Sequence, residues 1–379
     1  MKVTGPWLSD PATQEWLLAM ENCGYLAYFV GGCVRNALMQ RPVQDVDLAT
    51  SAKPEIVTDI AERIGFKVIP TGLDHGTVTL LAQQTRLEVT TFRRDVATDG
   101  RHATIAYSTS IEDDAQRRDF TMNALFADRS GTVIDPIGGL PDVLARCVRF
   151  VGDPDQRIQE DYLRILRFFR LHAVYGDLSL GIDAEGLAAC SANIAGLETL
   201  SKERIGAEMR KLLSAPDPVQ TVASMAQTGV LATILPGADA RWLGPLHHFE
   251  AGIPPNWLRR LAAIGGTDPD ENLRLSRAEG RDLDELKRYI GTPHSTAALG
   301  WLLGHKAVDV VLLRSAMFET VLPPQWRDEI ARGTSARLPV TASDLMPELT
   351  GKALGERLRQ IENRWLASDL RLERAQLLA

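Results

Sequence analysis

A closely spaced pair of carboxylates is the feature of this 379-residue sequence with the clearest chemistry. Asp45 and Asp47 are separated by one residue, so on a strand both side chains project from the same face. Two such carboxylates can bind hard divalent cations through their oxygens. Upstream, Gly31 and Gly32 let backbone N–H groups approach a phosphate, and Arg35 can bind its oxygens. The combination predicts a site for a nucleoside triphosphate with Mg²⁺, whereas a D-x-D pair alone is more often only a polar strand end.

A second cluster, residues 117–125, is dense in groups that contact ribose and phosphate. Arg118 offers charge-assisted donors, while Asp119 and Asn123 can hold hydroxyl groups. A structural role is the alternative, in which Asp119 caps the following helix and the arginines are solvated. Taken alone, the residues leave both roles open.

A third cluster lies in residues 160–170, for which the pattern predicts a helix. Asp161 and Arg164 are three residues apart and therefore neighbours on one helical face. The simplest interpretation is a surface ion pair, worth ~0.3 kcal/mol. Arg167 and Arg170 drift around such a helix, and Arg170 ends about half a turn from Asp161. We expect these later arginines to meet phosphates or the N-terminal domain.

The elements that must position these residues are mixed at first and helical later. Ser9-Asp10-Pro11 is typical of a helix start, and Gly24 closes that helix. We expect strands over residues 25–30, 46–49, 66–69, 77–82 and 86–92, helices over 34–39 and 54–64, and a mobile polar loop over 93–110. Beyond residue 141 helical periodicity dominates, with breaks at 215–218, 252–255 and 322–324.

Composition limits the remaining possibilities. The length favours two or more domains, and 45% hydrophobic with 24% charged residues describes a soluble globular protein. The net charge of −7 disfavours indiscriminate nucleic-acid binding but allows a local basic track. We expect no signal peptide and no membrane-spanning stretch. The four cysteines form no C-x-x-C pair, which favours buried free thiols in the cytoplasm.

The order of the motifs resembles the class II CCA-adding enzymes of the tRNA nucleotidyltransferase/poly(A) polymerase family. The matching motifs are G-G-x-V-R, D-x-D, T-F-R-x-D…D-G-R, R-R-D-F-T-x-N-A and E-D-x-x-R-x-x-R, all in the first half of the chain. The resemblance implies an α+β protein with a polymerase-β-like nucleotidyltransferase head followed by an all-α neck, body and tail. The corresponding division is an N-terminal helix (1–24), the head (25–147), the neck (148–215), and the body and tail (216–379).

The resemblance also implies roles for individual residues. Asp45 and Asp47 would hold two Mg²⁺ ions, and Glu88 would be either a third catalytic carboxylate or an ordinary strand glutamate. The implied nucleotide-binding set is Gly31, Gly32, Arg35, Arg118, Asp119, Asn123, Asp161, Arg164, Arg167 and Arg170. Within it, Asp161 would accept from the exocyclic amine of cytosine or adenine, and Arg164 would donate to the adjacent ring nitrogen. Uracil and guanine would oppose the carboxylate with a carbonyl oxygen.

The implied activity is addition of C, C and A to the 3′ end of tRNA from CTP and ATP, without a protein partner. Asp95, Asp99 and Arg101 match the family's flexible loop, which disfavours an enzyme that adds only CC. Binding of the tRNA acceptor end and T-arm would need a basic stripe. Candidates for that stripe are Arg204, Arg210, Lys211, Lys352, Arg357, Arg359 and Arg364.

Three departures or contrasts qualify the resemblance. The family usually has aspartate where this chain has Asn36. No histidine is followed by aspartate, so we expect no phosphohydrolase activity of the H-D type. The nearest alternative is a bacterial poly(A) polymerase, but residues 70–79 lack the basic signature of those enzymes.

Overall fold

The computed structural model describes residues 1–69, 76–82, 85–99 and 102–379. Contacts within the chain divide it into two compact units. Unit 1 comprises Met1–Glu208 and Gln227–Thr233, and unit 2 comprises Met209–Ala226 and Ile234–Ala379.

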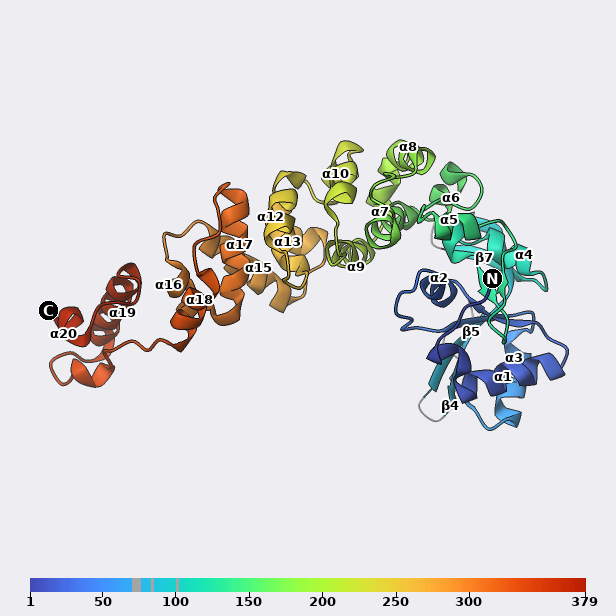
Figure 1. Ribbon diagram of the computed structural model, residues 1–379, viewed down its shortest axis with the longest axis horizontal. Coiled ribbons are helices and arrows are strands. Elements are labelled where there is room, and N and C mark those ends of the chain that lie inside the picture. The colour runs from blue at the N-terminus through green and yellow to red at the C-terminus, as the bar shows by residue number, and fades with distance from the viewer. Residues whose placement is uncertain (70–75, 83–84, 100–101) are drawn as a thin grey trace. The chain divides into compact units, whose positions relative to one another are not determined.

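A mixed sheet forms the N-terminal part of unit 1 (Figure 1), with the strand order β3-β4-β5-β2-β1-β8-β9. Its strands are β1 (Ala27–Val30), β2 (Asp47–Thr50), β3 (Lys67–Ile69), β4 (Thr77–Ala82), β5 (Thr85–Thr91), β8 (Phe126–Ala127) and β9 (Val133–Ile134). Only β2 and β5 pair in parallel, and the other neighbours are antiparallel. The five strands expected from the sequence are therefore confirmed, with ends shifted by up to two residues.

The register of this sheet assembles one functional edge. Strand β1 runs antiparallel to β2, with Phe29 opposite Leu48. The end of β1 and the start of β2 therefore lie at the same edge of the sheet. Strand β5 runs parallel to β2 on its other flank and places Glu88 directly beside Asp47.

Helices cover the sheet and continue beyond it within unit 1 (Figure 1). They are α1 (Pro11–Asn22), α2 (Gly32–Leu38), α3 (Pro54–Arg63), α4 (Ile111–Gln116), α5 (Leu140–Leu144), α6 (Pro154–Glu160), α7 (Leu163–Tyr175), α8 (Ala184–Ala192), α9 (Lys202–Leu213, which crosses the unit boundary) and α11 (Val230–Ile234, whose last residue belongs to unit 2). Short 3₁₀ turns are η1 (Pro6–Ser9), η3 (Thr121–Asn123) and η4 (Ile194–Thr199).

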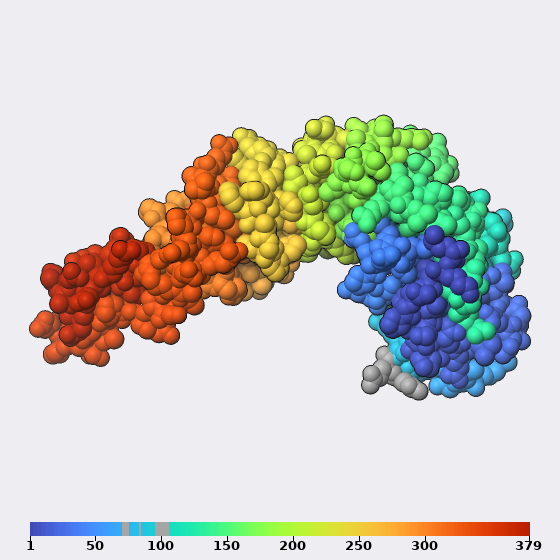
Figure 2. Space-filling view, in the orientation of Figure 1, coloured from blue at the N-terminus to red at the C-terminus, as the bar shows by residue number. Residues whose placement is uncertain are grey.

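Helix α1 begins where the sequence predicts. The Asp10 carboxylate accepts a hydrogen bond from the Thr13 N–H at 2.9 Å, which satisfies a donor of the first turn. Trp16, Leu17 and Met20 are fully buried on one face of the helix. Figure 2 shows the N-terminal segment, in the darkest blue, on the outside of unit 1.

The expected mobile loop over residues 93–110 is wrong. Strands β6 (Arg93–Asp99) and β7 (His102–Tyr107) form a separate antiparallel pair with an irregularity between Asp95 and Ala97. The sequence signal for this hairpin is the Asp99-Gly100 dipeptide between two runs that contain β-branched residues. The number of polar residues obscured that signal. Arg101 lies outside the described residues.

The continuous helix expected over residues 160–170 is also wrong. Helix α6 ends at Glu160, and Asp161 has extended backbone angles (φ −157°, ψ 103°) before α7 begins at Leu163. The Asp161 side chain, one residue before the N-cap Tyr162, accepts from the Leu163 N–H at 3.1 Å and so satisfies a backbone donor at the start of α7. Aspartate favours such a position over a helix-interior one because its carboxylate competes for backbone donors.

An aromatic stack fixes α7 against the sheet region of unit 1. The rings of Phe120, Phe150 and Phe168 are all fully buried. Centroids of Phe120 and Phe150 are 4.8 Å apart, and those of Phe150 and Phe168 are 5.3 Å apart. Aromatic pairs at these separations add to the stabilisation from area burial. The stack therefore holds η3, which follows Phe120, close to α7, which carries Phe168.

Unit 2 consists of helices and connecting loops, with an isolated β-bridge between Ala238 and Gly265. Its elements are α10 (Val219–Gln227, which crosses the unit boundary), η5 (Ala240–Trp242), α12 (Leu243–Phe249), α13 (Trp257–Ile264), α14 (Pro269–Asn272), α15 (Arg277–Ile290), α16 (Thr296–Leu303), η6 (Gly304–Lys306), α17 (Ala307–Met317), α18 (Trp326–Ser335), η7 (Ala342–Asp344), α19 (Gly351–Ala367) and α20 (Arg374–Leu378). Helices end before each of the three breaks expected from proline-rich sequence, so those predictions are confirmed.

One stretch has the length and apolar composition of a membrane span. Residues Thr296–Met317 have a mean hydropathy of 1.3, high enough for a span by length and composition. The stretch is interrupted, however, because Gly304 has φ +58° between α16 and α17. Both helices pack against α18, and the apolar side chains form part of the core of unit 2.

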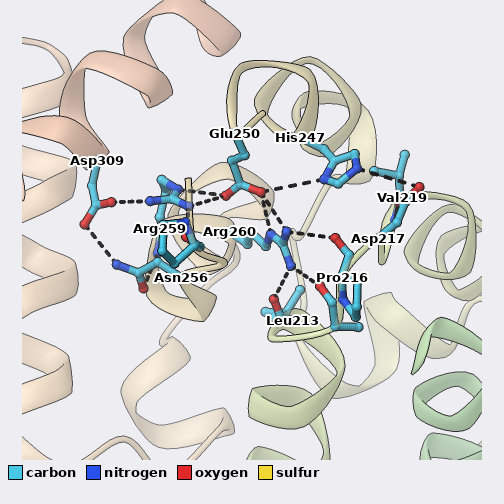
Figure 3. A network of polar contacts seen from close by, with 12 residues as sticks. Leu213, Pro216, Asp217, Val219, His247, Glu250, Asn256, Arg259, Arg260 and Asp309 are labelled. Atoms are coloured by element: carbon cyan, nitrogen blue, oxygen red, sulfur yellow. Dashed lines mark hydrogen bonds and ion pairs between the residues drawn. The ribbon is translucent and has the colours of Figure 1, made fainter. Parts of the chain in front are cut away.

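A buried network of charges lies in unit 2 (Figure 3). The Glu250 carboxylate is bound by Arg259 Nε at 2.7 Å and by Arg260 Nε at 2.9 Å. Arg260 also donates to the carbonyl oxygens of Leu213 and Ala215, near the end of α9. The network therefore connects α9, α12 and α13.

All four cysteines are free thiols. Cys33 and Cys190 are buried as expected, but Cys147 is half-buried and Cys23 is exposed. Burial raises the pKa of the Cys33 thiol to about 11.

Candidate active site

The two carboxylates of the D-x-D motif lie at the start of β2. Asp47 is the first residue of the strand and Asp45 precedes it by two. Within the described residues, neither carboxylate accepts a hydrogen bond. Partial desolvation raises the pKa of Asp47, and the negative charges of Glu88 and Asp45 raise it further. The positive charge of Arg118 opposes this shift but does not cancel it. The charges of these groups therefore repel one another, and a bound cation would relieve the repulsion.

This donor set fits a divalent metal ion in chemistry, because hard cations prefer carboxylate oxygens. Glu88 does not form a three-carboxylate metal site with Asp45 and Asp47. Among the described residues, no three acidic, histidine or cysteine side chains lie close enough to bind one metal ion together. Glu88 Oε1 instead accepts from Arg86 Nη2 at 2.6 Å. A pair of carboxylates is thus placed for a metal, with a third on the neighbouring strand.

The glycine turn between β1 and α2 needs glycine for a geometric reason. Gly31 has φ +72°, and a Cβ there would lie 3.2 Å from Arg118 Nη1. A larger residue would therefore strain the backbone and press on Arg118. A Cβ on Gly32 would meet only Arg35 Nη2, at 3.7 Å.

Arg35 is buried, and its donors are engaged by neighbouring side chains. Its guanidinium donates to Tyr175 Oη at 2.7 Å, to Asn36 Oδ1 at 2.8 Å, and to Asn123 Oδ1. It also lies over the Tyr175 ring, 3.9 Å from the centroid. Arg35 thus fixes Asn123 in place. Asn36, the departure from the family pattern, also donates to the Pro42 carbonyl at 2.9 Å.

Asp114 holds the pair of arginines that opens the second cluster. Its carboxylate is fully buried and accepts from Arg117 Nε and Arg118 Nη2, each at 2.8 Å. Arg117 and Arg118 are therefore bound to Asp114, whereas the structural alternative expected them to be solvated. Burial lowers the pKa of Arg117 to about 10, even though Asp114 opposes the shift.

Asp119 lies at the centre of a network that joins the second and third clusters. Its Oδ1 accepts from the Phe120 N–H at 2.9 Å and from Asn123 Nδ2 at 3.0 Å. Its Oδ2 accepts from Arg167 Nε at 2.7 Å. Burial alone would raise the pKa of Asp119, but Arg167 and Asn123 outweigh it and lower the pKa to about 2. The expectation that a later arginine meets the N-terminal domain is confirmed for Arg167.

The pair Asp161 and Arg164 does not form the surface ion pair of the simplest interpretation. Asp161 Oδ2 accepts from Arg204 Nη2 at 2.7 Å. Arg164 donates to the Glu160 carboxylate and, at 2.6 Å, to the Arg157 carbonyl. Each member of the pair therefore has another partner within the protein.

Residues of the second and third clusters line one hollow of about 280 Å³. Its lining consists of Arg117, Arg118, Asp119, Asp161, Leu163, Arg164, Arg167 and Arg204. Arg170 is not among them and pairs with Glu208, Nε to Oε2, at 2.5 Å. Five of the predicted nucleotide-binding residues are thus brought together, and Arg118 links them to the Gly31 turn.

Comparison with known proteins agrees with this arrangement. The family profile described as "Poly A polymerase head domain" matches residues 27–149, and "Probable RNA and SrmB-binding site of polymerase A" matches 180–241. A CCA-adding enzyme of Geobacillus thermodenitrificans is 37% identical over 84% of this chain and 80% of its own length. The mitochondrial CCA tRNA nucleotidyltransferase 1 of Mus musculus is 32% identical over 96% of this chain and 87% of its own length.

The chain belongs to the CCA-adding enzyme family. A solved structure of the Bacillus stearothermophilus CCA-adding enzyme in complex with CTP superposes with a TM-score of 0.71 and 27% identity, covering 95% of this chain and 94% of that one. The fold is accordingly that of a nucleotidyltransferase head with a helical remainder. Membership in the CCA-adding family implies a divalent metal ion, for which Asp45 and Asp47 provide suitable donors.

Sequence reasoning missed several residues that hold the site of this CCA-adding family member. Arg204 was assigned only to RNA binding, yet it lies against Asp161. No spacing signal could reveal a pair 43 residues apart. By contrast, the Glu160–Arg164 pair and the Asp114–Arg118 pair both have the i,i+4 spacing, which the sequence displays.

The pKa of Asp119 predicts a pH-dependent contribution to stability. Because the folded-state pKa is about 2 against an ordinary value of 3.8, the ionised group stabilises the fold above about pH 4 and loses this effect as the pH falls toward 2. Replacing Asp119 with Asn is therefore expected to cost about 2 kcal/mol at pH 6 and about half as much at pH 3. Urea unfolding at both pH values measures this, with exposed Asp59→Asn as control. A cost independent of pH would contradict the assignment.

Proposed function

We propose that this protein adds C, C and A to the 3′ end of tRNA from CTP and ATP, in the cytoplasm. The observation that carries the proposal is the single hollow shared by Arg118, Asp119, Asp161, Arg164 and Arg167. It offers phosphate-binding and base-reading groups in one place, and Arg118 connects it to the carboxylates of β2. The proposed domains are the head (25–147), the neck (148–215), and the body and tail (216–379), after an N-terminal helix (1–24).

The carboxylates would hold two Mg²⁺ ions, whose positive charge would favour ionisation of a 3′-hydroxyl and would offset the negative charge of the triphosphate and pyrophosphate. Asp45 and Asp47 are the ligands in this proposal, with Glu88 the candidate for a third. The backbone of the Gly31 and Gly32 turn would approach the triphosphate.

Arg118, with Nε buried and unpaired in the structure, would bind phosphate, while Asp119 and Asn123 would lie near the ribose. Arg35, already bound to Asn123, would position that residue. Arg167 would keep Asp119 ionised. Arg170, paired with Glu208, would support α7 from outside the hollow.

Asp161 and Arg164 would select the base. Asp161 keeps free lone pairs after accepting from Arg204 and the Leu163 N–H, since a carboxylate can accept about four hydrogen bonds. Arg164 would turn from Glu160 toward the ring nitrogen. Charge-assisted hydrogen bonds worth ~1.5–3 kcal/mol each give roughly 10- to 100-fold discrimination against U and G.

The activity is tested with tRNAs that lack CCA, CA or A, each supplied with single nucleotides and with CTP plus ATP. The expected result is ordered addition of C, C and A, after which extension stops. Long A tails would instead assign the chain to the poly(A) polymerases. Addition of CC without A would overturn the proposed complete activity.

Base selection gives a separate prediction. In Asp161→Asn an amide N–H₂ can face the carbonyl oxygen of uracil, so the preference for CTP over UTP is expected to fall roughly 10- to 100-fold. The ratio of kcat/KM values for the two nucleotides measures this. Asp155→Asn, on the exposed side of α6, is the matched control. An unchanged ratio in Asp161→Asn would remove Asp161 from base selection.

A further inference from the structure

A second and larger hollow lies against the β2 carboxylates and is not used by the nucleotide groups described above. Its volume is about 670 Å³, within the range typical of small-ligand sites. Its lining consists of Trp7, Asp10, Thr13, Gln44, Asp45, Val46, Asp47, Thr85, Arg86, Leu87 and Glu88. The walls therefore come from η1, α1, the approach to β2, and β5.

The tryptophan in this wall is held in a defined position. Gly5 has φ +152° and ψ 163°, and a Cβ there would lie 2.6 Å from Trp7 Nε1, so only glycine lets the chain fold closely against the indole. The Trp7 ring meets Phe29 edge-on at 4.9 Å between centroids. Gln14 Nε2 donates to the Leu8 carbonyl at 2.6 Å and to the Arg129 carbonyl at 3.0 Å, which ties the segment down. Trp7 is half-buried, so part of the ring stays accessible.

The opposite wall contains the only basic side chain among the lining residues of this hollow. Arg86 on β5 has 63% of its side chain exposed and is bound to Glu88 at 2.6 Å. The Thr85 hydroxyl donates to Asp10 at 3.1 Å and so joins β5 to the start of α1. An aromatic ring and a guanidinium thus flank the carboxylates proposed to hold the metal.

The position of this hollow relative to the strands determines what it can bind. The Gly31 turn follows β1 on one flank of β2, while Glu88 and Arg86 lie on β5, the other flank. In phosphoryl transfer the attacking and leaving oxygens lie roughly in line on opposite sides of the phosphorus. If the triphosphate lies on the Gly31 side, the attacking 3′-hydroxyl must come from the β5 side.

We propose that the hollow beside β5 receives the 3′-terminal nucleotide of the RNA primer, with Trp7 stacking on its base and Arg86 binding its backbone phosphate. The proposal rests on the proposed nucleotidyl transfer. Stacking on an aromatic ring tolerates every base, which suits a primer whose last residue changes at each addition. Arginine suits the phosphate because its planar donors match the phosphate oxygens. Gln44, which is exposed, offers a further polar contact to the ribose.

Steady-state kinetics separate this role from nucleotide binding. Arg86→Ala and Trp7→Leu are each expected to raise the KM for a tRNA primer roughly 10-fold and to change the KM for CTP less than about twofold. The matched control is Arg129→Ala, which removes another surface arginine paired with a glutamate. Arg86 is exposed, so its removal does not threaten the fold. An unchanged primer KM in Arg86→Ala, or an equal rise in both KM values, would overturn the proposal.

A binding measurement without turnover tests Trp7 directly. A tRNA with 2-aminopurine as its last nucleotide is titrated with the protein in the absence of nucleotides. Stacking on Trp7 is expected to quench the fluorescence, Trp7→Leu to abolish the quenching at saturation, and Trp7→Phe to retain part of it. Quenching by Trp7→Leu equal to that of the wild type would contradict the proposal.

The two proposals can fail separately. Quenching that depends on Trp7, in a protein that adds no C or A to tRNA, would overturn the proposed function and support the primer site. Ordered CCA addition without quenching of the terminal 2-aminopurine would support the proposed function and overturn the primer site.

Discussion

Replacing Asp45 or Asp47 with alanine is expected to lower nucleotide addition about 10⁴-fold, which corresponds to about 5.5 kcal/mol of transition-state stabilisation. These two carboxylates are the proposed metal ligands. Neither accepts a hydrogen bond from the described residues, so both can bind a metal ion. Single-turnover primer extension at saturating CTP measures the loss.

Stability distinguishes this loss of activity from unfolding. The pKa of Asp47 is raised by partial burial and by the negative charges of Glu88 and Asp45, so removing Asp45 relieves repulsion in the metal-free protein. Asp45→Ala is therefore expected to melt no lower than the wild type. The control is Asp59→Ala on the exposed side of α3, which should retain full activity. Activity within tenfold of the wild type in Asp47→Ala would exclude it as a metal ligand.

The second large effect concerns unit 2, where Glu250→Ala is expected to destabilise the fold by about 3–5 kcal/mol. Glu250 is 4% exposed and lies between Arg259 and Arg260, which are 2% and 1% exposed (Figure 3). Removing it leaves two buried guanidinium groups with Asp309 as their remaining acidic partner, 2.5 Å from Arg259 Nη1. Burying an uncompensated charge costs far more than losing a surface pair.

Urea unfolding followed by tryptophan fluorescence measures this cost. Glu285→Ala is the matched control, because Glu285 pairs with Lys306 at 2.9 Å on the surface and its loss is expected to cost at most about 1 kcal/mol. Glu250→Gln should fall between the two, since the amide keeps the shape and one acceptor. A cost below about 1 kcal/mol for Glu250→Ala would show that the network does not support the fold.

Most elements of the fold could be predicted from the sequence because their signals are local. Strand alternation around Val89, the cap at Asp10, and the proline-rich breaks all follow from residues close together in the chain. The two wrong elements also have local causes. A polar hairpin was taken for a loop, and the helix-breaking preference of Asp161 was given too little weight against the surrounding helical pattern.

The sequence by itself indicated the chemistry of this protein through its residue types and their order, a glycine turn followed by a D-x-D pair, although only Asp47 of that pair lies on a strand. Only the tertiary structure decided which acid pairs with which arginine. Asp161 binds Arg204 rather than Arg164, and Asp119 binds Arg167 from 48 residues away. Such partners depend on how buried surfaces, such as the aromatic stack beneath α7, bring distant segments together. That packing involves many weak contacts spread over the chain, and no short motif encodes it.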